Sequence, residues 1–143
     1  MLGGPLPAPL CAQRRVVAVA EAGSAKSELV LAWRSPSETL LMTTDPGCLA
    51  AVAAFAAARS DGCLVDQTGG ILSLLMTGSR TSDLLLRLGS ADAIPALGEA
   101  RTGRLAELCV TSLCSRPGEI ALLVERVYVR HLVGWIRETL ADF

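Results

Sequence analysis

The sequence has few of the side chains that usually carry out chemistry or bind charged ligands. Among its 143 residues there is one histidine, aromatic residues make up 3%, and charged residues make up 19%. The formal net charge is −1 with no block of like charges, which argues against a nucleic-acid partner. So few aromatics also argue against a base-stacking or flavin-stacking surface. Hydrophobic residues reach 51%, which predicts that another protein covers part of the surface.

The cysteines lack the spacing of a disulfide framework or a zinc site. Their number is odd, their spacing is irregular, and no CxxC pair occurs. We therefore expect each thiol to act as a small buried hydrophobe. They are Cys11, Cys48, Cys63, Cys109 and Cys114.

Export and membrane signals are also missing. No positive charge precedes the first apolar residues, and Pro5, Pro7 and Pro9 interrupt the stretch where a signal peptide would have its apolar region. The longest apolar run, Leu49 to Ala58, is about half of the ~20 residues that a membrane-spanning helix needs. We expect a cytoplasmic protein with no membrane partner.

The length suits one domain. Residues 1–13 are predicted to be a flexible N-terminal segment and residues 14–143 a single domain. Three segments of this domain share one plan, in which two strands joined by a turn lead to a helix. Because the strands are joined by short turns, the predicted class is α+β: an antiparallel or mixed sheet built from strand-turn-strand-helix units, with helices packed on one face.

The first segment has apolar and β-branched runs at residues 15–20, 29–34 and 40–43, which are typical of strands. Asp45 and Pro46 then predict a helix start, because aspartate accepts hydrogen bonds from free helical N–H groups and proline suits the first position. This helix is expected to run to about Arg59.

The second segment is predicted to pair residues 63–68 with residues 71–77 as a hairpin across Gly69-Gly70. Ser79 is expected to cap the helix that follows, and Gly89 to end it.

A loop is expected over residues 90–102, and it leads into the third segment. There residues 105–113 should pair with residues 120–125 across the Arg116-Pro117-Gly118 turn. The last helix is expected from about residue 128 to 141, because its apolar residues recur at helical spacing.

No catalytic, cofactor-binding or metal-binding residue is predicted. His131 lies on the last helix without an HExxH, GxSxG or Cys/His signature nearby. Gly69-Gly70 belongs to no phosphate-binding pattern. Asp83 falls in the first turn of a predicted helix, where its charge favours the helix dipole. Asp66 has no explanation from the sequence alone.

Three residues are candidates for a protein interface. The helix predicted from Pro46 has no polar face, so one sheet can cover only one of its sides. Ala51 and Ala54 therefore become candidate contacts with a second protein. Trp135 lies one position from the apolar stripe of its helix, and a half-exposed tryptophan is a plausible interface anchor. Trp33 lies within an apolar strand and is expected in the core.

Three stretches of the sequence carry a resemblance to a known family. They are LAWRSPSETLLM (31–42), LVDQTGGILSLLMTGSRTSDLLLRL (64–88), and TGRLAELCVTSLC with EIALLVERVYVRHLVGWI (102–136). Together they resemble the gamma subunit of heterotetrameric sarcosine oxidase, which is itself similar to the first domain of folate-binding aminomethyltransferases. The family often has a lysine-glycine-cysteine run after the second helix, whereas this chain has Leu88-Gly89-Ser90-Ala91.

The resemblance implies a non-catalytic subunit, with the chemistry in other subunits of the complex. Those partners would carry FAD, FMN, NAD and zinc, oxidise sarcosine to glycine, and pass the one-carbon unit to tetrahydrofolate. A related complex acting on another amine remains open. An alternative is a stand-alone folate-binding aminomethyltransferase-like protein, although one domain of this size cannot supply a whole folate site. An iron–sulfur repair factor of the same superfamily would need the lysine-glycine-cysteine motif.

Overall fold

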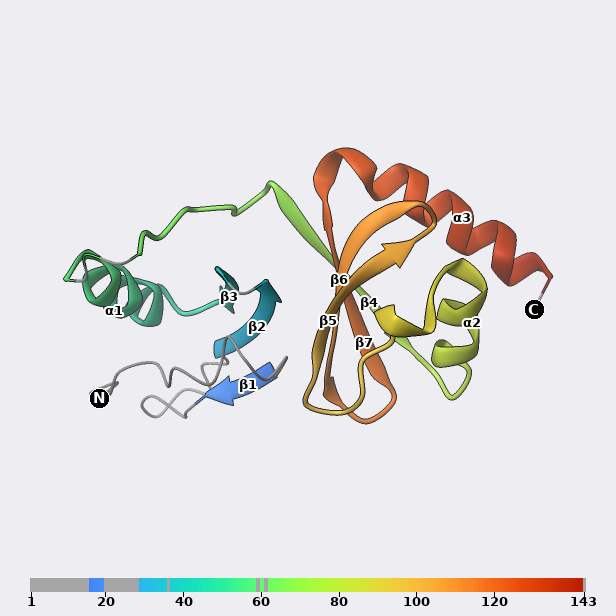
Figure 1. Ribbon diagram of the computed structural model, residues 1–143, viewed down its shortest axis with the longest axis horizontal. Coiled ribbons are helices and arrows are strands. Elements are labelled where there is room, and N and C mark those ends of the chain that lie inside the picture. The colour runs from blue at the N-terminus through green and yellow to red at the C-terminus, as the bar shows by residue number, and fades with distance from the viewer. Residues whose placement is uncertain (1–15, 20–28, 36, 59, 61, 143) are drawn as a thin grey trace.

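The computed structural model describes residues 16–19, 29–35, 37–58, 60 and 62–142, which form two sheets and three α-helices (Figure 1). Every strand pair in these residues is antiparallel, which confirms the α+β class. The elements in chain order are β1 (Val16–Val19), β2 (Leu29–Ser35), β3 (Glu38–Thr43), α1 (Pro46–Ala57), β4 (Ile71–Thr77), α2 (Thr81–Leu88), the 3-10 turn η2 (Ala91–Ala93), β5 (Ala100–Leu105), β6 (Leu108–Arg116), β7 (Glu119–Glu125), the 3-10 turn η3 (Arg126–Tyr128) and α3 (Val129–Ala141).

The first three strands form one sheet in the order β1-β2-β3. Val16 pairs with Ala32, and Leu31 pairs with Leu41. The register of β2 against β3 shifts between Trp33 and Ser35, which marks a bulge at the end of the hairpin. This part confirms the strands expected in the first segment.

The other four strands form a second sheet in the order β4-β7-β6-β5. β6 and β7 are central and carry buried apolar residues on both faces, as strands covered on both sides do. The predicted turn at Pro117-Gly118 joins them, and Gly118 has the positive φ of 74° that this turn requires.

The main core lies between the four-stranded sheet and two helices, α2 and α3, which cover one of its faces (Figure 1). α2 brings Leu84, Leu85 and Leu88 to this face at helical spacing, and α3 brings Leu132. Helices packed on one face of the sheet were expected. The buried residues of this core include Leu84, Leu85, Leu88, Leu105, Val110, Ile120, Leu122, Val124 and Leu132.

The opposite face of the four-stranded sheet packs on the three-stranded sheet. Ala32 of β2 forms a buried cluster with Ala100, Leu113 and Leu123 of the larger sheet. Thr102 Oγ1 also donates a hydrogen bond of 3.2 Å to the backbone oxygen of Arg34. The layers are therefore sheet, sheet and helices.

The hairpin predicted across Gly69-Gly70 is wrong. Residues 63–68 form no strand, and β4 pairs with β7. The two glycines still make a turn, in which the N–H groups of Gly70 and Ile71 donate to Gln67 O at 2.9 and 3.2 Å. The distant strand is preferred because pairing with β7 completes the face that the two helices bury.

Two further expectations around α2 need correction. Ser79 does not cap the helix, because the cap residue is Arg80. Thr81 Oγ1 donates a hydrogen bond of 2.9 Å to Gly78 O. Gly89 does end α2, as expected. Residues 90–102 are not all loop, because they contain η2 and the first residues of β5.

Some expectations fall on residues outside the described part of the chain. These are the flexible segment 1–13, the burial of Cys11 and the side chain of Trp33. Whether residues 14–143 are one domain stays a prediction. Within the described residues, no helix has both the length and the hydrophobicity that crossing a bilayer requires.

Candidate functional site

The first candidate site is the surface of α1, and its start is built as the sequence predicts. Asp45 is the N-cap residue, and its Oδ1 accepts a hydrogen bond of 2.8 Å from the N–H of Gly47. Thr43 Oγ1 in turn accepts from the N–H of Asp45 at 3.1 Å. Pro46 takes the first helical position, where its missing N–H costs nothing. The helix ends at Ala57, close to the expected boundary.

α1 is apolar all round but mostly uncovered. Cys48 is its one buried residue, and Leu49 is 45% exposed. Ala51 and Ala54 are both exposed, and they are neighbours on the helix surface because they are three residues apart. The helix contacts β3, at the end of the molecule away from α2 and α3 (Figure 1). α1 therefore presents an uncharged apolar surface suited to a second protein.

The third predicted interface residue, Trp135, lies on a different surface. It is 45% exposed on α3, and its ring centroid is 6.3 Å from that of His131. α3 and α1 lie on opposite sides of the sheets (Figure 1). The structure therefore does not bring Trp135 together with Ala51 and Ala54.

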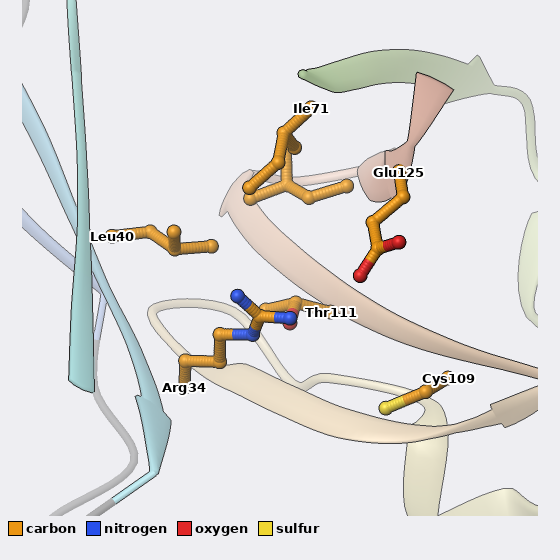
Figure 2. A pocket seen from close by; sticks show the side chains of 7 residues that line it. Arg34, Leu40, Ile71, Cys109, Thr111 and Glu125 are labelled. Atoms are coloured by element: carbon orange, nitrogen blue, oxygen red, sulfur yellow. The ribbon is translucent and has the colours of Figure 1, made fainter. Parts of the chain in front are cut away.

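A small recess lies between the two sheets (Figure 2). Arg34 reaches into it from β2 and Glu125 from the end of β7, with their charged groups directed toward each other. Arg34 also forms an ion pair of 3.7 Å with Glu38. The recess encloses only about 10 Å³, far below the ~300–1,000 Å³ of ligand pockets. The other lining residues are Leu40, Ile71, Cys109, Thr111 and Leu123.

The acidic residues and the histidine singled out in the sequence have local structural partners. Asp66 Oδ1 accepts a hydrogen bond of 2.8 Å from the N–H of Thr68, and hydrogen bonds from the Thr68 side chain and backbone lower the pKa of Asp66. Asp83 forms an ion pair of 3.9 Å with Arg80 in the first turn of α2. His131 is exposed, with Nε2 3.1 Å from Ala106 O.

The cysteines divide into two kinds. Cys48 and Cys114 are buried as expected, but Cys63 and Cys109 are exposed, so the expectation of burial is wrong for these two. Cys63 is exposed because the strand predicted around it does not form. Burial raises the pKa of the Cys114 thiol. Among the described residues, no three or more of the histidines, cysteines and acidic residues group as a metal ion would require.

Comparison with known proteins finds a likeness of structure. No protein-family model and no curated protein sequence matches this chain. The fold is similar to that of a chain in the heterotetrameric sarcosine oxidase from Corynebacterium sp. U-96, solved in complex with pyrrole 2-carboxylate. The TM-score is 0.72 with 22% sequence identity, and the match covers 95% of this chain and 73% of that chain. At this identity the likeness establishes the fold.

Two features of the surface were missed from the sequence. The recess is assembled from several strands, so only the strand registers could have located it. The exposed outer edge of β4 was missed because the predicted hairpin would have covered it. A signal was present, since β4 is a fully uncharged strand.

Proposed function

We propose that this chain is a non-catalytic structural subunit of a heteromeric flavin-dependent amine oxidase similar to sarcosine oxidase, in the position of the gamma subunit. The observation that carries the proposal is the fold match over 95% of the chain. The same match covers 73% of the other chain, so that chain is only moderately longer than this one. The likeness thus spans most of both chains, as expected if this chain is a small subunit.

The surface of α1 supports the assignment of a partner. Leu49 and several alanines of α1 expose apolar surface to water, which is unfavourable. Interfaces of permanent complexes are apolar in the same way. Small side chains also let another backbone approach closely. In the proposed complex α1 packs against a partner subunit, with Ala51 and Ala54 in the contact.

The chemistry belongs to the partners in this proposal. They hold FAD, FMN, NAD and zinc, and they oxidise a secondary or N-methyl amine such as sarcosine and deliver the one-carbon unit to tetrahydrofolate. The isolated chain is then expected to be colourless, without a flavin absorption spectrum and without oxidase activity.

Affinity purification of the tagged chain from its native host tests the proposal. Flavin-containing subunits should co-purify at fixed stoichiometry with amine oxidase activity. Ala54→Arg should reduce partner retention by about 10²-fold, because an unpaired buried charge costs about 3 kcal/mol. The matched control is Ser82→Arg on the exposed side of α2, which should retain the partners fully.

Two results would contradict the proposal. One is full partner retention by Ala54→Arg, and also by Ala51→Arg, which would remove α1 from the interface. The other is stoichiometric binding of flavin or tetrahydrofolate by the isolated chain. Binding of tetrahydrofolate alone would favour the stand-alone aminomethyltransferase-like alternative.

A further inference from the structure

β4 forms one edge of the four-stranded sheet, and backbone hydrogen bonds at its two ends show how it is oriented. Arg126 N donates to Gly70 O at 2.8 Å just before the strand. Gly78 N donates to Gly118 O at 3.3 Å just after it. In an antiparallel pair, such hydrogen-bonded positions recur at every second residue. The even-numbered residues of β4 therefore direct their N–H and C=O groups toward β7.

The odd-numbered residues then direct their N–H and C=O groups away from the sheet. Among these odd-numbered residues, within the described part of the chain, Ile71 alone has a backbone partner on the outer side of the strand. Its N–H donates a hydrogen bond of 3.2 Å to Gln67 O. The outward positions whose N–H and C=O groups could both pair with a further strand are Ser73, Leu75 and Thr77. All three are exposed, and Leu75 is 62% exposed.

Among the residues that the structure describes, this edge has no charge, proline or bulge to hinder pairing with another strand. Its sequence, ILSLLMT, has no charge and no proline, and its register against β7 is continuous, without a bulge. The opposite edge differs: β5 carries Arg101 and Arg104, packs against η2, and is tied to β2 through Thr102. The contrast indicates that the β4 edge is available for β-augmentation.

We propose that β4 pairs with β4 of a second copy of this chain, antiparallel, about a two-fold axis at Leu75. In this register Leu75 lies opposite the partner's Leu75, and Ser73 lies opposite the partner's Thr77. Cross-strand hydroxyl pairs and apolar pairs both stabilise a sheet. An axis at Leu74 would place Ser73 opposite the partner's Leu75 and would require the N–H of Ile71, which Gln67 already occupies.

The resulting dimer joins the two four-stranded sheets into one continuous sheet. The same strand serves both copies, as an isologous interface requires. The contact involves neither Ala51 nor Ala54, so it does not rest on the proposed function. An experiment can therefore disprove the homodimer without disproving the heteromeric complex, and the reverse also holds.

Sedimentation equilibrium of the full chain tests the dimer. The apparent mass of the native chain should rise toward twice the mass of one chain as its concentration is raised to about 0.1 mM. Leu75→Lys should raise the dimer dissociation constant at least ~10-fold, because like charges would meet at the axis. The control is Leu86→Lys, which changes a 50% exposed leucine of α2 and should leave the dimer unchanged. Circular dichroism checks that both variants are folded.

Disulfide trapping tests the register directly. In a chain with Cys11, Cys63 and Cys109 changed to serine, Leu75→Cys should give a covalent dimer under mild oxidation. Residues opposite each other in a hydrogen-bonded pair have Cα atoms ~5.5 Å apart, within the ~4.4–6.8 Å that a disulfide spans. Leu86→Cys should give no covalent dimer in the same assay.

The proposal is overturned by any of three results. The native chain could be monomeric over the whole concentration range, which would leave the edge to a strand of another protein. The dimer could persist unchanged in Leu75→Lys, which would place its interface elsewhere. Leu75→Cys could fail to cross-link, or could do so no better than Leu86→Cys.

Discussion

A single methyl group added at Gly89 should destabilise the protein strongly. Gly89 ends α2 and forms an isolated antiparallel bridge with Leu105. Two hydrogen bonds hold the segments together: Ala106 N donates to Leu88 O at 2.7 Å, and Ser90 N donates to Arg104 O at 3.4 Å. A Cβ at position 89 would lie 2.1 Å from Arg104 O and 3.0 Å from Leu105 Cδ2.

The cost of Gly89→Ala comes from this contact and not from the backbone conformation. The φ of Gly89 is 179°, which is extended and open to any residue. Because the contacted atom is a backbone oxygen, β5 must move away from α2. Overpacking of this kind costs ~1–3 kcal/mol. We expect about 3 kcal/mol, since the shift also weakens the adjoining hydrogen bonds.

Gly134 offers a control with the same chemical change and the opposite sign. It lies within α3, and a Cβ there meets nothing within 4 Å. Gly134→Ala should stabilise the fold by ~0.5–1 kcal/mol, because alanine loses less backbone entropy in a helix. Urea denaturation measures both free energies of unfolding. The reasoning is refuted if Gly89→Ala changes stability by less than ~0.5 kcal/mol, well below the overpacking range.

Two further predictions concern α1 and the thiol of β6. Asp45→Ala should cost about 1 kcal/mol of unfolding free energy through the lost bond to Gly47, and an unchanged denaturation midpoint would show that the cap contributes nothing. Burial raises the pKa of Cys114, so the unfolded thiol ionises first and stability should fall as pH rises above about 9. In Cys114→Ala the loss of stability that comes from this thiol above pH ~9 should disappear. Thermal unfolding midpoints of both proteins, measured over a series of pH values, test this.

The elements predicted correctly are those specified by local chemistry. Asp45 and Pro46 start α1 through contacts within one turn, and Pro117-Gly118 reverses the chain within four residues. α3 follows from apolar residues repeating at helical spacing, with Leu132 buried. Such signals act over a few residues, so one sequence is sufficient to read them.

The errors arise where distant residues compete. Residues 63–68 have strand-like composition beside a glycine turn, yet β4 pairs with β7, because the face shared with the helices outweighs the local hairpin. The turn between β5 and β6 gave no signal at all. It places Ala106 and Glu107 at positive φ, 50° and 65°, where glycine or asparagine would be expected.

The candidate interface was partly predictable. An apolar helix without a polar face indicated that Ala51 and Ala54 would be exposed, and they are. The half-exposure of Trp135 followed from its place beside the apolar stripe of α3. Their separation onto two surfaces could not be predicted, because it depends on how the two sheets stack.

The pairing of β4 with β7 also sets an order of events during synthesis. Ile71 pairs with Glu125 and Thr77 with Glu119, so β4 leaves the ribosome long before its partner exists. β5, β6 and β7 follow one another with short turns and can assemble locally. β4 must close a long loop to join them, which is the slower step. Until then the strand exposes two unpaired edges, and the nascent chain is most prone to aggregation in that interval.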